Sequence, residues 1–164
     1  MKRVALSILL LAQPAAAMTS SELGAARQWV VGIYDRLPQA NFDWSKQNFD
    51  TGLRGLVRRD ARFASASRSV GAIDGVPFCD CQDTAEDYRV TRSSARSLGS
   101  ARAAITIWLR NNGNGRFVVD VVRESDGGFA IADIHSLATP SLLAFLRREI
   151  PAEERELRQP LRGR

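Results

Sequence analysis

The sequence has very few of the residues from which metal sites and nucleophilic sites are built. It contains one histidine and two cysteines, and its lysines are Lys2 and Lys46. A single histidine excludes any site that requires two, including the HExxH motif of zinc peptidases. A glycine-rich phosphate loop and a GxSxG elbow are also missing. These absences argue against hydrolases and nucleotide-binding proteins, and we expect neither a cofactor nor a metal ion.

Long apolar runs are missing beyond the N-terminus. Residues 1–17 have a basic start, a short apolar centre and three final alanines, which is typical of a secretory signal peptide. The apolar centre is too short to span a bilayer. We expect cleavage after Ala17, where no cysteine follows that could carry a lipid anchor. The expected protein is exported, periplasmic or secreted, and has no membrane span.

The rest of the chain is only mildly basic. Removing Lys2 and Arg3 with the signal peptide lowers the formal net charge from +5 to +3. The arginines are dispersed and do not cluster beside aromatic residues that could stack on bases, so we expect no nucleic-acid partner. The length fits a single domain, residues 18–150, followed by a charged tail at 151–164 that we expect to be disordered.

Helical periodicity occurs near both ends of this domain. Apolar residues at three- and four-residue spacing predict one helix capped at residues 20–22 and ending near residue 37, and a second at residues 49–66. A short closing helix is expected to about residue 150, capped by Thr139 with Pro140 at its first position. Between them, residues 71–83 contain a proline and two glycines, which predict a short or bulged strand at residues 72–83.

Three runs of strand-forming residues lie between residues 101 and 137. The linking sequences NNGNG and SDGG contain Asn-Gly and Asp-Gly pairs, which accept the positive φ of two-residue hairpin turns. Residues 88–97 are a candidate for a fourth strand. The predicted fold is α+β, with two N-terminal helices packed on a curved antiparallel sheet of about four strands, and a short C-terminal helix.

The period of two in a strand assigns side chains to faces. In the first run Trp108 lies opposite to Ile105 and Ile107. In the last run the odd-numbered residues 129–135 are expected to share one face. Asp133 and His135 would then project together, about 7 Å apart.

Short motifs resemble a known family. The sequences VPF (76–78), QD (82–83), IADI (131–134) and SLL (141–143) are similar to a family of small secreted bacterial domains of unknown function within the nuclear transport factor 2-like, or cystatin-like, superfamily. The resemblance covers roughly residues 21–150. It implies a cone-shaped half-barrel with a cavity at its wide end. Members use this cavity for catalysis, for ligand binding or as an interface, so the fold alone does not select a function.

Four residues are candidates for a ligand site: Asp83, Trp108, Asp133 and His135. Asp133 and His135 are also the candidate catalytic pair, because an acid beside a histidine in a cavity moves protons when the pocket raises its pKa. The structural alternative is that Asp133 accepts hydrogen bonds from backbone or arginine and that His135 lies at the sheet edge. We favour the structural alternative, and for Asp83 we likewise favour a role in capping backbone amides.

Cys79 and Cys81 are the remaining chemical feature. Two cysteines in an exported protein are expected to be oxidised, and a bond between them requires the backbone to bend. The alternatives are free or intermolecular thiols, a metal site and a redox role. A lone CxC lacks the second ligand pair of strong zinc motifs, so the local disulfide is preferred.

Three functions remain open. The first is a non-catalytic exported module that binds a small hydrophobic ligand or an envelope protein. The second is an isomerase- or cyclase-type enzyme that uses Asp133 and His135. The third is a structural or inhibitory partner that acts through the Trp108 face, for which a homodimer is one form.

Overall fold

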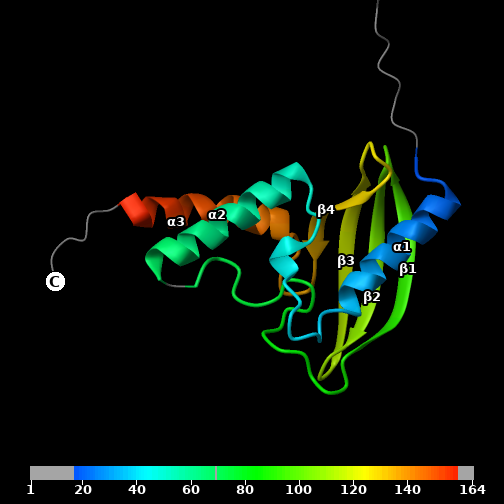
Figure 1. The fold of residues 1–164 in the computed structure, drawn as a ribbon, viewed down its shortest axis with the longest axis horizontal. Coiled ribbons are helices and arrows are strands. Elements are labelled where there is room, and N and C mark those ends of the chain that lie inside the picture. The colour runs from blue at the N-terminus through cyan, green and yellow to red at the C-terminus, as the bar shows by residue number, and fades with distance from the viewer. Residues whose placement is uncertain (1–16, 69, 159–164) are drawn as a thin grey trace, which may run out of the picture.

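The structure is a computed structural model that describes residues 17–68 and 70–158 (Figure 1). Within this part of the chain the order is α1 (Ser20–Tyr34), η1 (Trp44–Lys46), α2 (Thr51–Ser67), β1 (Arg89–Gly99), β2 (Arg102–Arg110), β3 (Asn114–Arg123), β4 (Phe129–His135) and α3 (Leu142–Arg158). The expected signal peptide lies outside the described residues except for Ala17. The α+β fold is confirmed.

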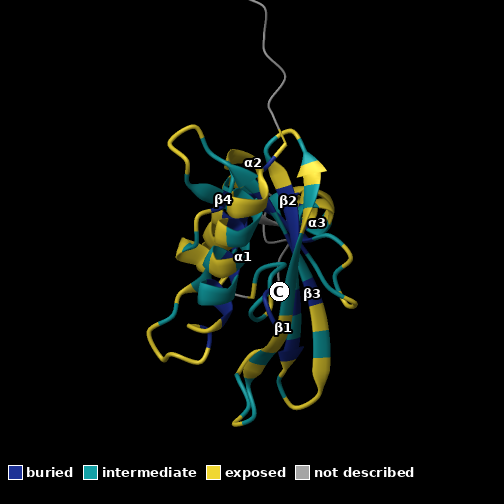
Figure 2. Cartoon of the chain, turned by 90° about the vertical axis from the view of Figure 1, so that its right-hand side faces the viewer, coloured by how far each residue is buried: buried dark blue, intermediate teal, exposed yellow. Residues whose placement is uncertain are grey.

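The four strands form one open antiparallel sheet in the order β1-β2-β3-β4. Helix α1 packs against β1 and β2, while α2 and α3 pack side by side beyond one end of the sheet (Figure 1). The face under α1, which we call the inner face, carries Ile105, Ile107, Phe117, Val119 and Ile131, all buried. From Phe117 to Val121, buried residues of β3 alternate with residues of intermediate burial; Figure 2 colours these two classes dark blue and teal. The opposite side of the sheet is called the outer face.

Helix α1 begins at a capping box. The Thr19 hydroxyl accepts a hydrogen bond from the backbone of Glu22, whose carboxylate accepts one from the backbone of Thr19. The cap therefore lies one residue before the range expected from the sequence. Val30, Ile33 and Tyr34 then face the core, as the helical spacing requires.

The tightest hairpin turn contains neither asparagine nor glycine. Ser100 and Ala101 join β1 to β2 with φ values of 45° and 58°. The loop after β2 is longer and takes its positive φ at Asn112 and Gly113. The expected linking sequence at residues 111–115 is shorter in the structure, because Asn114 and Gly115 already belong to β3. The meander itself is confirmed.

Strand β4 contains a β-bulge that alternation in the sequence does not reveal. Asp133 pairs with Asp120, but Ile131 pairs with Val121, which leaves Ala132 as the extra residue. Ile131 and Asp133 consequently point to opposite faces. The prediction that residues 129–135 alternate without interruption was therefore wrong. The bulge puts Ile131 into the core while the acidic side chain stays on the outer face.

The segment at residues 72–83 forms no strand. It makes one isolated bridge, in which the N–H of Val76 donates to the carbonyl of Cys81 at 2.7 Å. Gly75 adopts a φ of 112°, and a Cβ there would lie 2.9 Å from the same carbonyl, so only glycine fits this bend. Phe78 is fully buried and anchors the segment to the core.

Helix α3 differs from the prediction at both ends. It begins at Leu142 and its first turn is capped by Ser141, whose Oγ accepts from the N–H of Ala144 at 3.0 Å, so Thr139 is not the cap. It continues through Pro151 to residue 158. The expected disordered tail is therefore helical over residues 151–158, and its remainder lies outside the described residues. Packing against α2 compensates for the hydrogen bond that proline removes.

Candidate functional site

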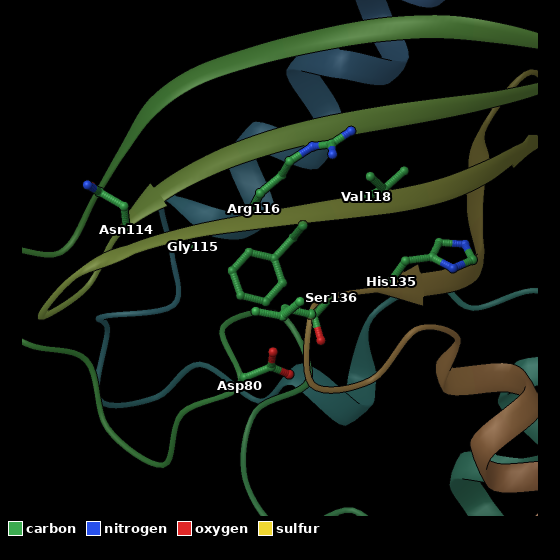
Figure 3. A pocket seen from close by; sticks show the side chains of 9 residues that line it. Asp80, Asn114, Gly115, Arg116, Val118, His135 and Ser136 are labelled. Carbon is green, nitrogen blue, oxygen red and sulfur yellow. The ribbon is translucent and has the colours of Figure 1, made fainter.

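A groove of about 500 Å³ opens at the end of the sheet where β4 stops (Figure 3). Its lining comes from β3, from the end of β4 and the residues after it, and from the loop at Asp80. The lining residues are Asp80, Asn114, Gly115, Arg116, Phe117, Val118, His135, Ser136 and Leu137. This set is referred to below as the groove.

The groove exists because β4 is shorter than β3. The last register pair of these strands is Val118 with His135. The chain then turns away, since Ser136 N–H donates to the carbonyl of Thr139 at 2.9 Å and the Thr139 N–H donates to the Ser136 hydroxyl at 2.8 Å. Residues 114–117 of β3 pair with β2 alone.

His135 is held at both ring nitrogens. Its Nδ1 lies 2.6 Å from the carbonyl oxygen of Pro140, and its Nε2 lies 3.4 Å from the Asp120 carboxylate and 3.7 Å from that of Asp133. Partial burial by itself would lower the pKa of His135. The Pro140 carbonyl and the two carboxylates outweigh burial and raise this pKa above its usual 6.5. The imidazole is therefore biased towards its cationic form.

Asp133 is buried, and both of its oxygens have partners. Oδ1 accepts from the backbone N–H groups of Ile134 and Leu143, each at 2.8 Å, and Oδ2 accepts from the Ser141 hydroxyl at 2.6 Å. Asp133 therefore fixes the first turn of α3 to the end of β4. A general base needs a lone pair that faces the substrate. The geometry favours the structural interpretation of Asp133.

Ser141, Asp133 and His135 do not form a nucleophilic triad. In a triad the serine hydroxyl bonds to the histidine. Here the Ser141 hydroxyl donates to the Asp133 carboxylate, and its oxygen accepts the helix-capping N–H of Ala144. The serine is thus a helix cap held by an acid.

Asp133 and His135 share the outer face, as predicted, but the other two candidate residues lie elsewhere. Trp108 is on the outer face of β2, in register with Arg116 of the groove, and the Arg92 guanidinium lies 4.7 Å from its ring centre. Asp83 is exposed and is not among the groove residues.

Near Asp83 in the chain, Asp87 caps a backbone amide of a different segment, the loop between β2 and β3. Its carboxylate accepts from the backbone N–H of Asn112 at 2.8 Å and from Arg110 at 2.7 Å. These contacts lower the pKa of Asp87, with the Asn112 N–H as the largest cause. Asp87 therefore fixes the loop between β2 and β3.

Cys79 and Cys81 are bonded to each other, with Cα atoms 5.1 Å apart. Asp80 between them takes a φ of 48°, which supplies the bend that such a short bridge requires. The local disulfide expected from the sequence is confirmed. Its structural consequence is that the Asp80 carboxylate is presented at the groove.

Several residues in or beside the groove were not anticipated from the sequence. Asp120 could have been found from alternation in β3, because it faces the same side as Val118, but its pairing with Asp133 depends on the hidden bulge. Arg116 and Leu137 gave no sequence signal. Leu137 is 97% exposed, the highest exposure of any large apolar residue in the described part of the chain.

The outer face carries four arginines that make no ion pair among the described residues. Register places Arg92 and Arg116 on either side of Trp108, Arg96 beside Ala104, and Arg102 beside Val122; the four are Arg92, Arg96, Arg102 and Arg116. The acids of this face, Asp120 and Asp133, are engaged by His135. The face is therefore basic along most of its width.

Comparisons with known proteins identified no similar family model, curated protein or solved structure. In the described residues no cluster of acids, histidines and cysteines has the form of a metal site. No helix in those residues is both long and apolar enough to cross a membrane. The fold and site define a small α+β domain with a groove at a strand edge.

Proposed function

We propose that this chain is an exported, non-catalytic binding domain whose groove holds a small apolar ligand or a segment of an envelope protein. The observation that carries the proposal is the groove itself, with a volume in the range of ligand sites and a mixed lining of apolar and charged groups. Leu137 adds a large apolar side chain that the fold leaves in solvent.

The isomerase or cyclase alternative receives less support. The lone pairs of Asp133 are directed at two backbone N–H groups and a serine hydroxyl. His135 lines the groove, but its ring bridges Pro140 and two carboxylates, which favours a fixed cation over a proton shuttle. Catalysis would require these structural contacts to break in every turnover.

A relationship to the nuclear transport factor 2-like superfamily is part of the proposal. It is supported by a helix packed across an open antiparallel sheet of four strands, with α2 following α1 in the chain. The groove differs from the expected cone cavity, since it lies at the edge of β3, whereas the space between α1 and the sheet holds core side chains.

A fragment screen by nuclear magnetic resonance tests the binding site. Small apolar fragments should shift the amide signals of Val118, His135 and Leu137. The Val118→Arg variant should abolish these shifts by filling the groove. The matched control is Val122→Arg, the same change on the same strand and face but outside the groove. Fragment binding that survives Val118→Arg, or that gathers elsewhere, would refute the assignment.

Export is tested separately. The full chain expressed in a bacterium with an outer membrane should appear in the periplasm with Met18 as its first residue. Retention of the intact N-terminus in the cytoplasm would contradict the export part of the proposal without bearing on the groove.

A further inference from the structure

The hydrogen bonds at the end of β3 reveal which way each of its backbone groups points. The Arg123 N–H donates to the Ala101 carbonyl on the β2 side, and the next N–H, of Glu124, donates to the Gly128 carbonyl on the β4 side, each at 2.9 Å. Antiparallel ladders alternate in this way along the strand. The backbone N–H and carbonyl groups of odd-numbered residues of β3 therefore point towards β2, and those of even-numbered residues point towards β4.

Strand β4 agrees with this assignment. Ile131, the partner of Val121, directs its N–H and carbonyl away from β3 to Asn48 and Asp50, at 2.8 Å each. Odd-numbered Val121 thus makes no ladder bond to β4. The even-numbered residues Val118, Asp120 and Val122 remain to hold the two strands together.

Beyond Val118 the even-numbered backbone groups face the groove. Arg116 is the next such residue, and β4 has already ended at His135. Among the described residues, the Arg116 N–H and carbonyl make no main-chain hydrogen bond to β4 or to a loop. If β4 had continued in register, Leu137 would face Arg116, but the turn after Ser136 carries it into solvent. The groove is an unfilled position in a β-ladder.

The two sides of this position differ in charge. Arg116, Val118 and His135 lie on the outer side of the sheet, while Asp80 lies towards the inner side (Figure 3). The Arg116 guanidinium makes no ion pair within the described residues, and His135 is biased towards its cation. Phe117 is buried and forms the inner floor of the groove.

We propose that the groove accepts an extended peptide segment that adds as a further strand, pairing with the main chain of Arg116. Its side chains alternate, with an acidic residue on the outer side against Arg116 and His135 and an apolar residue on the inner side over Phe117. The inference rests on the proposed function and names its partner as a peptide in place of a small molecule.

A second copy of the chain does not fit this position. Edge-to-edge pairing of two β3 strands about Arg116 would place two arginines directly opposite each other, and like charges in a cross-strand pair destabilise it. Ser136 and Leu137, which begin the turn after β4, line the far wall of the groove, so the edge of β3 at Arg116 is enclosed on that side and is not a free sheet edge. An acidic peptide satisfies both constraints.

Hydrogen exchange of the free protein tests the geometry first. The Arg116 amide should exchange at least about tenfold faster than the amides of Phe117, which faces β2, and Val118, which pairs with β4. Equal protection of Arg116 would show that its N–H is already bonded, and would overturn the proposal.

A displayed library of short random peptides is then selected against the purified full chain. The expected sequences alternate apolar and acidic residues. Against them, Arg116→Ala removes the charge but keeps the N–H, and should weaken binding up to about fivefold. Arg116→Pro also removes the N–H, which faces away from β2, and should weaken binding at least about tenfold further.

Peptides with a modified backbone provide a test that does not require the proline variant to fold. N-methylation of the peptide amide that pairs with the Arg116 carbonyl should abolish binding, while methylation of the neighbouring amide should not. Selected peptides that bind Arg116→Pro normally or tolerate both methylations would refute strand addition. Failure to select any peptide would also refute it, and if apolar fragments still bind the groove, the proposed function stands without this inference.

Discussion

At the scale of single residues, the outer face of the sheet uses its acids for structure. Asp133 and Asp120 are a cross-strand pair of like charges, which would repel each other if left alone. The arrangement is stable because His135 supplies a positive charge beside both, and the first turn of α3 supplies hydrogen-bond donors to Asp133. Removing His135 or a donor of the first turn of α3 would leave a carboxylate of this face without one of its partners.

Replacing Asp133 with alanine should lower the free energy of unfolding by about 3 kcal/mol, because two N–H groups and a hydroxyl lose their acceptor in a buried place. Urea denaturation followed by circular dichroism measures the change. Asp83→Ala is the matched control, since Asp83 is exposed, and it should change stability by less than about 0.5 kcal/mol. Unchanged stability of the Asp133 variant would exclude the capping role.

His135 makes stability depend on pH. Its pKa is raised in the folded protein, so the stabilisation is complete below 6.5, the ordinary value, and is lost as the pH rises through the folded pKa. The chain has one histidine, so its titration is followed from a single imidazole signal by nuclear magnetic resonance. Asp120→Asn should return the pKa towards 6.5, and His135→Gln should remove the pH dependence in this window. A titration at or below 6.5 in the unmodified protein would contradict the assignment.

At the scale of elements, the contact between α2 and α3 contains one ion pair and one pair of neighbouring acids. Arg59 and Glu154 form an ion pair at 2.7 Å that is half exposed and worth well under about 1 kcal/mol. Beneath it, Asp60 is buried and accepts the Ala72 N–H at 2.6 Å. Glu153 lies close to Asp60, and its Oε2 is buried without a hydrogen-bond partner in the described part of the chain.

Glu153→Gln should raise stability near neutral pH by about 1 kcal/mol. Burial raises the pKa of both Asp60 and Glu153, so folding favours their protonated forms and stability falls as the pH rises through those values. An amide removes the repulsion and can donate to Asp60. Thermal unfolding at acidic and neutral pH measures the effect. Glu154→Gln, which breaks only the exposed pair, should be slightly destabilising instead, and equal behaviour of the two variants would refute the argument.

The predictability of each element follows from how local its determinants are. The helices and the last three strands could be predicted because apolar spacing and turn residues report on neighbours in the chain. The bulge at Ala132 and the continuation of α3 through Pro151 could not, because packing against Asn48–Asp50 and α2 decides them. For the site, the shared face of Asp133 and His135 was predictable from alternation. The groove depends on where β4 ends relative to β3, which no residue in either strand encodes alone.

At the scale of the whole molecule, the distribution of charge limits self-association. The two carboxylates of the outer face are partly offset by His135, while the four arginines of this face have no ion pair among the described residues. Two outer faces brought together would bury like charges around Trp108 without compensation. A partner for this face must supply negative charge.

The purified protein should therefore be a monomer at low ionic strength, in contrast to the homodimer considered from the sequence. Sedimentation velocity over a wide range of concentration measures the oligomeric state. Raising the salt concentration screens the arginines and should not change the result unless an apolar contact through Trp108 exists. A concentration-dependent dimer that disappears in Trp108→Ala, but persists in the control Leu98→Ala, would show that the outer face associates with itself. In that case the apolar contribution of Trp108 outweighs the repulsion between arginines, and charge would not select the partner of this face.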